Sequence, residues 1–185
     1  MQISRLIYRA LLTAAVLTLT ACQQTQVGPI ATEGDAVHRV KLVTINGVHL
    51  LERTDGSTTT GRSLTPTAQT AVTIGVGGGV IATGAGELTV PPGALVQDVD
   101  LSMQERPTGT SFRFGPNGLA FELPATLRIA VLQQDVEGLD LSRLRIAGAS
   151  DSGDDWQVIG GTYDPATGTI SAPIHHFSQY ALCME

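Results

Sequence analysis

The stretch FGPNGLAFELPATLRIAVL (residues 114–132) contains the two signals that decide the fold. The Pro-Asn-Gly tripeptide at 116–118 favours a tight corner, because asparagine and glycine tolerate positive φ. After the corner, apolar residues fall at every second position: Leu127, Ile129 and Val131. This period of two predicts a strand with one buried face. Pro124 suits the first position of that strand, where no ladder donor is needed.

Strand-like runs of the same kind recur throughout residues 71–185. They are separated by three further turn signals: PPG (91–93), SGDD (152–155) and DPATG (164–168). Helical periodicity is weak, and only VEGLDLSRL (136–144) is compatible with a helical turn. Regular short strands between turns predict an all-β fold, an antiparallel β-sandwich over 71–185. The expected core aromatics are Phe112, Phe114, Phe121 and Trp156.

An additional β-hairpin is predicted at residues 37–56, before the sandwich. Asn46-Gly47 is the preferred central pair of a type I′ turn. The turn sets a register that pairs Ile45 with Val48, Val43 with Leu50, Thr44 with His49 and Lys41 with Glu52. A lone hairpin is marginally stable in water, so we expect it to pack on the sandwich. Residues 57–70 have no hydrophobic periodicity and are interpreted as a linker.

The first 21 residues have the anatomy of an export signal. Arg5 and Arg9 precede an uncharged apolar run over 10–21, which is too short to span a bilayer comfortably. The run ends at Leu19, Thr20, Ala21 and Cys22, which resembles the lipobox of bacterial lipoproteins.

The lipobox resemblance implies a set of processing steps. A peptidase would cut before Cys22, whose thiol would accept a diacylglycerol, and a further acyl chain such as palmitate would make the anchor stable. Residues 22–36 are then a flexible tether. The expected location is the cell envelope, and Gln23 is compatible with the outer membrane if the cell is Gram-negative.

Charge and cysteine content restrict the partners. Without Arg5 and Arg9 the chain has 9 basic and 17 acidic residues, a net charge of −8. This excess of negative charge argues against nucleic acid as a partner. With Cys22 acylated, Cys183 has no intramolecular disulfide partner and is expected to be a small buried hydrophobe.

Two motifs in the sandwich region suggest a family. LTVPPGAL (88–95), with Pro92-Gly93 suited to a type II turn, and FGPNGLAFELP (114–124) together resemble the ZU-five domain. That β-sandwich module occurs in ankyrins, zonula occludens scaffolds, netrin receptors and bacterial envelope proteins. The resemblance covers about residues 71–182 and implies a ZU-five type of sandwich with a role in protein interaction or structural support.

Conventional binding and catalytic motifs are weak in this sequence. GVGGGV (75–80) is followed by no helix that could hold a phosphate, so we interpret it as a hairpin corner. DSGDDW (151–156) lacks the glycine and glutamate of a calcium loop and is expected to be a hairpin turn. The four histidines have no zinc-ligand spacing, and no serine lies in a nucleophile elbow. We therefore expect this protein to bind no metal and no cofactor and to have no enzymatic activity.

The stretch IHHFSQYAL (174–182) leaves one alternative open. Ile170, Ala172 and Ile174 share one strand face, and Phe177 breaks this parity, so a bulge or kink is predicted at 175–178. Some ZU-five-containing proteins cleave themselves within a His-Phe-Ser triplet. By that resemblance, Ser178 would attack the carbonyl carbon of Phe177 with His176 moving the proton. The competing interpretation is structural: His176 and Ser178 satisfy backbone groups freed by the kink.

These observations lead to two expectations for function. The first is a membrane-anchored envelope lipoprotein, bound to the bilayer through acylated Cys22, that presents the sandwich to an unidentified envelope protein. The alternative is a self-cleaving module that breaks the Phe177–Ser178 bond.

Overall fold

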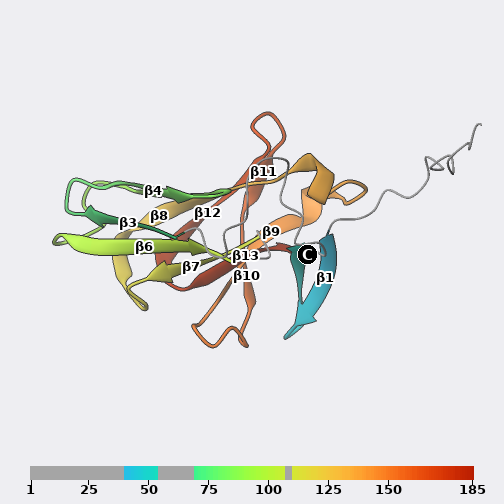
Figure 1. Cartoon of the computed structure of the whole chain (residues 1–185), viewed down its shortest axis with the longest axis horizontal. Helices are drawn as coiled ribbons and strands as arrows, with labels where there is room; N and C mark the ends of the chain where they lie inside the picture. The colour runs from blue at the N-terminus through green and yellow to red at the C-terminus, as the bar shows by residue number, and fades with distance from the viewer. Residues whose placement is uncertain (1–39, 54–68, 107–109) are drawn as a thin grey trace, which may run out of the picture. The chain divides into compact units, whose positions relative to one another are not determined.

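Alternating apolar residues and tight turns give this chain two antiparallel β-sheets (Figure 1). The structure, a computed structural model, describes residues 40–53, 69–106 and 110–185. All of them belong to one of two units into which the chain divides, Ala36–Glu185. The predicted signal peptide, lipobox, Cys22 and tether lie outside the described residues, as do 57–68 of the predicted linker.

The all-β sandwich prediction is confirmed for the described part of the chain. One sheet has the strand order β1-β2-β13-β7-β6-β3, and β9 and β10 join it beside β13. Its strands are β1 (Val40–Ile45), β2 (Val48–Arg53), β3 (Gln69–Ile74), β6 (Val99–Glu105), β7 (Ser111–Gly115), β9 (Leu144–Ala149), β10 (Gln157–Gly160) and β13 (Gln179–Met184). The other sheet has the order β11-β12-β8-β5-β4. Its strands are β4 (Gly79–Thr83), β5 (Gly86–Val90), β8 (Ala120–Ala130), β11 (Thr162–Asp164) and β12 (Thr169–His176).

The N-terminal hairpin has the predicted register. Each of the four expected cross-strand pairs occurs between β1 and β2. Asn46 and Gly47 have φ of 50° and 80°, as a type I′ turn requires. The hairpin packs on the sandwich as predicted, but it does so as part of a sheet. β2 pairs with β13 at Leu50↔Cys183 and His49↔Met184.

The main core lies between the two sheets and contains three of the four predicted aromatics, Phe112, Phe114 and Phe121. Trp156 is buried, but its assignment to this core was wrong. It belongs to a second cluster together with six smaller side chains: Val48, Leu50, Ala147, Ala149, Ala181 and Cys183. These residues alternate with main-core residues along β2, β9 and β13, so the second cluster covers the opposite face of the larger sheet. β13 is consequently buried at every position.

Two local predictions are also confirmed. The turn at 91–94 is type II, since Gly93 has φ of 81° and the Ala94 amide donates to the Pro91 carbonyl at 3.1 Å. A short 3₁₀ turn at Leu141–Arg143 (η2) confirms the expected helical turn, and another lies at Gln133–Asp135 (η1).

Three other details differ from expectation. β3 begins at Gln69, two residues inside the predicted linker. The glycine-rich loop at 75–78 joins β3 to β4 in the other sheet, so it is not a hairpin corner. Pro124 lies inside β8 rather than at its start, between the pairs Ala120↔His176 and Ala125↔Ile174. The strand register shifts there, and a proline is tolerated at an irregularity because no ladder hydrogen bond is lost.

Candidate functional site

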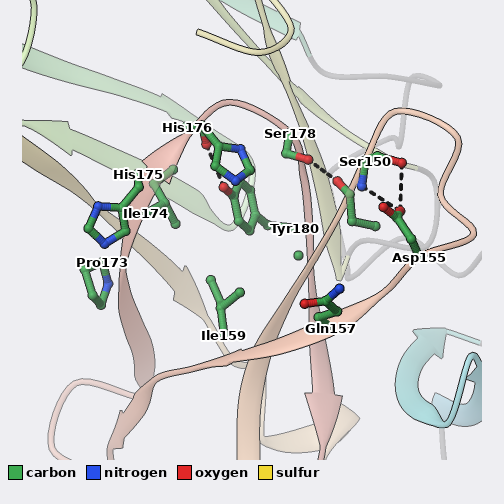
Figure 2. Close-up of a pocket in the computed structure, with 12 residues that line it drawn as sticks. Ser150, Asp155, Gln157, Ile159, Pro173, Ile174, His175, His176, Ser178 and Tyr180 are labelled. Carbon is green, nitrogen blue, oxygen red and sulfur yellow. Dashed lines mark hydrogen bonds between the residues drawn. The ribbon is translucent and has the colours of Figure 1, made fainter. Parts of the chain in front are cut away.

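The His-Phe-Ser triplet lies where the chain crosses from one sheet to the other (Figure 2). β12 ends at His176 in the smaller sheet, and β13 begins at Gln179 in the larger one. The predicted break in parity is confirmed, since Ile174 and Phe177 are buried while His175 and His176 between them are exposed. The final strand of the prediction is therefore two strands joined by a corner at Phe177-Ser178.

Phe177 fixes the corner in the main core. Its side chain is 1% exposed, and its ring centroid lies 5.2 Å from that of Phe114 and 5.1 Å from that of Phe121. Its amide donates to the Leu119 carbonyl at 2.7 Å, and its carbonyl accepts from the Gly118 amide at 3.2 Å. The corner is therefore bound to the loop between β7 and β8 through backbone and aromatic contacts.

Polar side chains bind the backbone on the other side of the corner. The Ser178 hydroxyl is buried and donates to the Ala149 carbonyl. The Tyr180 hydroxyl donates to the His176 carbonyl at 2.6 Å. Burial raises the pKa of Tyr180 to about 12, so the phenol stays protonated and keeps this hydrogen bond at neutral pH.

His176 lies beside the peptide carbonyl rather than on the serine hydroxyl. Its Nδ1 is 3.4 Å from the Phe177 carbonyl oxygen. Figure 2 shows the Ser178 hydroxyl directed away from the imidazole, and its hydrogen bond goes to the Ala149 carbonyl. In this arrangement the triplet holds backbone groups in place. An attack by Ser178 on Phe177 would first require the hydroxyl to leave Ala149.

Gln179 is a residue of this site that sequence analysis missed. Its amide is buried, accepts from the Arg106 guanidinium at 2.9 Å and donates to the Asp151 carbonyl at 2.7 Å. It thereby fastens the 150–156 turn to the start of β13. The sequence contains one sign of this role, a glutamine at the start of an otherwise apolar run. The role could not be predicted from that sign, because the partners of Gln179 lie far from it in the sequence.

The DSGDDW segment forms the predicted hairpin turn between β9 and β10. Asp155 accepts hydrogen bonds from the amide and hydroxyl of Ser150, at 2.8 and 2.7 Å. The hydrogen bond from the Ser150 hydroxyl, together with the one from the Ser150 amide, lowers the pKa of Asp155 below its usual range, so the carboxylate is charged at neutral pH. Across residues 40–53, 69–106 and 110–185, no group of three or more histidine, cysteine or acidic side chains is arranged to hold a metal ion.

A groove of about 390 Å³ opens beside the corner (Figure 2). One wall comes from β12 and carries Pro173, His175 and His176. The opposite wall comes from β10 and the preceding turn, and carries Ile159, Gln157 and Asp155. The groove therefore brings together two groups of residues. The two histidines were singled out in the sequence analysis, whereas the residues of β10 were not.

The remaining candidates are structural. His49 Nδ1 lies 2.8 Å from the Thr44 hydroxyl, across the hairpin pair predicted for it. Cys183 is buried as predicted. Desolvation, with a smaller contribution from Glu185, raises the pKa of its thiol to about 12, against the opposing charge of Arg145. The thiol is therefore protonated and weakly nucleophilic at neutral pH.

No known family model matches this sequence, and no curated protein matches it. Within the part of the chain that the structure describes, no helix is both long enough and apolar enough to cross a bilayer.

Proposed function

We propose that this protein is a bacterial envelope lipoprotein, anchored through acylated Cys22, whose ZU-five-like β-sandwich serves protein contact or structural support. The observation that carries the proposal is the order of features along the chain. A lipobox-type run, Leu19 to Cys22, follows an apolar segment, and the β-sandwich lies beyond it in Ala36–Glu185. Such an order places a folded unit beside a membrane through a lipid rather than through a spanning segment.

The bonding of the corner supports a role without catalysis. The hydroxyl groups of Ser178 and Tyr180 donate hydrogen bonds to backbone carbonyls. The Gln179 side-chain amide accepts one hydrogen bond and donates another. A hydroxyl used in this way satisfies a buried acceptor, which stabilises the fold, and it must leave that acceptor before it can attack a carbonyl carbon.

Acylation of Cys22 is the first testable prediction. Cells expressing the full chain and fed radioactive palmitate should label the wild-type protein, and Cys22→Ala should abolish the label because it removes the only proposed acceptor thiol. Cys183→Ala is the matched control, since it removes the other cysteine and should keep the label. Equal labelling of the wild type and Cys22→Ala would exclude the lipid anchor.

Self-cleavage is a second candidate, favoured by one specific contact. The Phe177 carbonyl oxygen has two potential donors near it, the Gly118 amide at 3.2 Å and His176 Nδ1 at 3.4 Å. Donors at this oxygen would stabilise negative charge in a tetrahedral intermediate. Ser178 Oγ would bond to the Phe177 carbonyl carbon, and the carbon–nitrogen bond would break as the hydroxyl proton passes to the amide nitrogen. Water would then hydrolyse the ester and leave a carboxylate on Phe177.

Intact mass under denaturing conditions tests self-cleavage. The proposal expects two fragments separated after Phe177 in the wild type and only full-length chain in Ser178→Ala. The same substitution leaves the Ala149 carbonyl without its donor, so it should lower the free energy of unfolding by about 1–3 kcal/mol. Wild-type protein that keeps its full mass after long incubation would eliminate cleavage and leave the structural role.

A further inference from the structure

We infer that the groove between β10 and β12 binds an extended peptide segment of a partner protein, which adds as a strand to the free edge of β10. The segment carries an aliphatic side chain next to a lysine or arginine. This inference specifies the partner for the protein contact proposed above. It does not depend on acylation of Cys22, so the palmitate experiment and the binding experiment can fail independently.

Two strand edges that have no strand partner among the described residues border the groove. Among the described residues, β10 pairs only with β9. β11 pairs with residues 169–171 of β12, and beyond that point β8 is the only strand paired with β12 in the part of the chain that the structure describes. The backbone groups of a free edge form hydrogen bonds readily with an added strand, which is a common mode of peptide recognition.

β10 is the better acceptor of the two edges. Pro173 has no N–H group, and within β12 its nitrogen must face away from β8, because otherwise a ladder bond would be lost. The free edge of β12 therefore lacks a donor at its centre, and proline at an edge disfavours strand addition. β10 contains no proline. A strand paired with β10 would extend the larger sheet and lie in the groove, facing His175 and His176.

The groove also provides a pocket for an aliphatic side chain. The register of β10 shifts between Val158 and Gly160, which leaves Ile159 without a partner on β9. Such a bulge changes the direction of a side chain, and Ile159 lines the groove while remaining 41% exposed. Gly148 keeps the floor open, since a Cβ there would meet the Tyr180 ring at 3.0 Å and the Ile159 side chain at 3.4 Å. Pro173 supplies an apolar surface on the opposite wall.

Charge at one end of the groove favours a basic neighbour for that aliphatic residue. The Asp155 carboxylate lines the groove, and its hydrogen bonds go to the neutral Ser150. Asp154 is exposed in the same turn, and the whole chain has a formal net charge of −6. A lysine or arginine at this end of the bound strand would meet negative charge, which increases both association rate and specificity.

Fluorescence polarisation with a defined probe tests the inference. The probe is a fluorescein-labelled peptide, Thr-Val-Lys-Val-Thr with a C-terminal amide, added to full-length protein in detergent. Ile159→Arg should weaken binding about tenfold or more, because it fills the pocket and places a positive charge near the lysine of the probe. Val158→Arg is the matched control. Val158 is 40% exposed on the same strand but does not line the groove, so this variant should bind as the wild type does.

Two modified probes separate strand addition from other modes of binding. Methylation of the backbone nitrogens removes the donors that pair with β10 and should abolish binding, and replacing lysine with glutamate should weaken it. Both protein variants change exposed side chains and should unfold at the wild-type temperature. The inference is overturned if the methylated probe binds as well as the parent, if both arginine variants behave alike, or if the wild type shows no Kd below about 1 mM.

Discussion

Replacing Phe177 with alanine is expected to lower the free energy of unfolding by about 3–5 kcal/mol. The ring is 1% exposed and packs against Phe114 and Phe121, so its removal leaves a cavity between the sheets. The corner backbone is held by its bonds to Leu119 and Gly118, which limits collapse around that cavity. The loss should therefore approach the upper end of the range measured for buried aromatic residues.

Urea unfolding measures this loss, because the midpoint falls in proportion to stability when the slope is unchanged. Trp156 is the only tryptophan in the chain and is buried in the second cluster, so its fluorescence reports the transition. Leu123→Ala is a suitable control, since Leu123 is exposed, and it should change stability by about 0.5 kcal/mol or less. A similar small change in Phe177→Ala would show that the corner is not anchored by its ring.

Breaking the ion pair between Arg53 and Asp135 should have an effect of comparable size. Two guanidinium nitrogens of Arg53 lie 2.7 Å from Asp135 Oδ2, and the two side chains are only 10% and 7% exposed. The pair joins the end of β2 to η1, so it also holds the N-terminal hairpin to the sandwich. Arg53→Met should cost about 3–5 kcal/mol, because it leaves a buried carboxylate without compensation.

A double-mutant cycle identifies the cause of that cost. Adding Asp135→Leu to Arg53→Met removes the uncompensated charge and should recover most of the lost stability. The exposed pair Lys41 and Glu52 provides a comparison within the same hairpin, at 3.3 Å. Lys41→Met should cost less than about 1 kcal/mol, because solvent screens that pair. Equal losses of stability in Arg53→Met and Lys41→Met would contradict the conclusion that burial makes the Arg53–Asp135 pair costly to break.

The features that sequence predicted well are those set by nearby residues. The register of the first hairpin follows from Asn46-Gly47 and a period of two, and every expected pair is present. The break before Phe177 follows from counting parity along a single run. In both cases the physical constraint, positive φ or strict alternation of faces, acts over a few residues and is visible without knowledge of the partner strands.

The errors arise where long-range pairing decides. Trp156 is a large apolar residue of the kind that cores contain. The alternation of apolar residues does not show which face it joins when a sheet is covered on both faces. Pro124 suggests the start of a strand, because a proline cannot donate a ladder hydrogen bond inside one. The register shift against β12 makes this proline acceptable inside β8. The groove unites Ile159 with Pro173 and His176 across two sheets, and no local pattern connects them. Its composition could be predicted only with the strand order in hand.

The central position of β13 has a consequence for how the protein is made. This strand pairs with β2, β7 and β9, and each of these precedes it in the sequence. The larger sheet therefore cannot be completed before residues 179–184 have been synthesised, and without them it would consist of three separate parts, β1-β2, β7-β6-β3 and β9-β10. A nascent chain that still lacks this strand would consequently expose one edge each of β2, β7 and β9, the edges that β13 covers in the finished sheet.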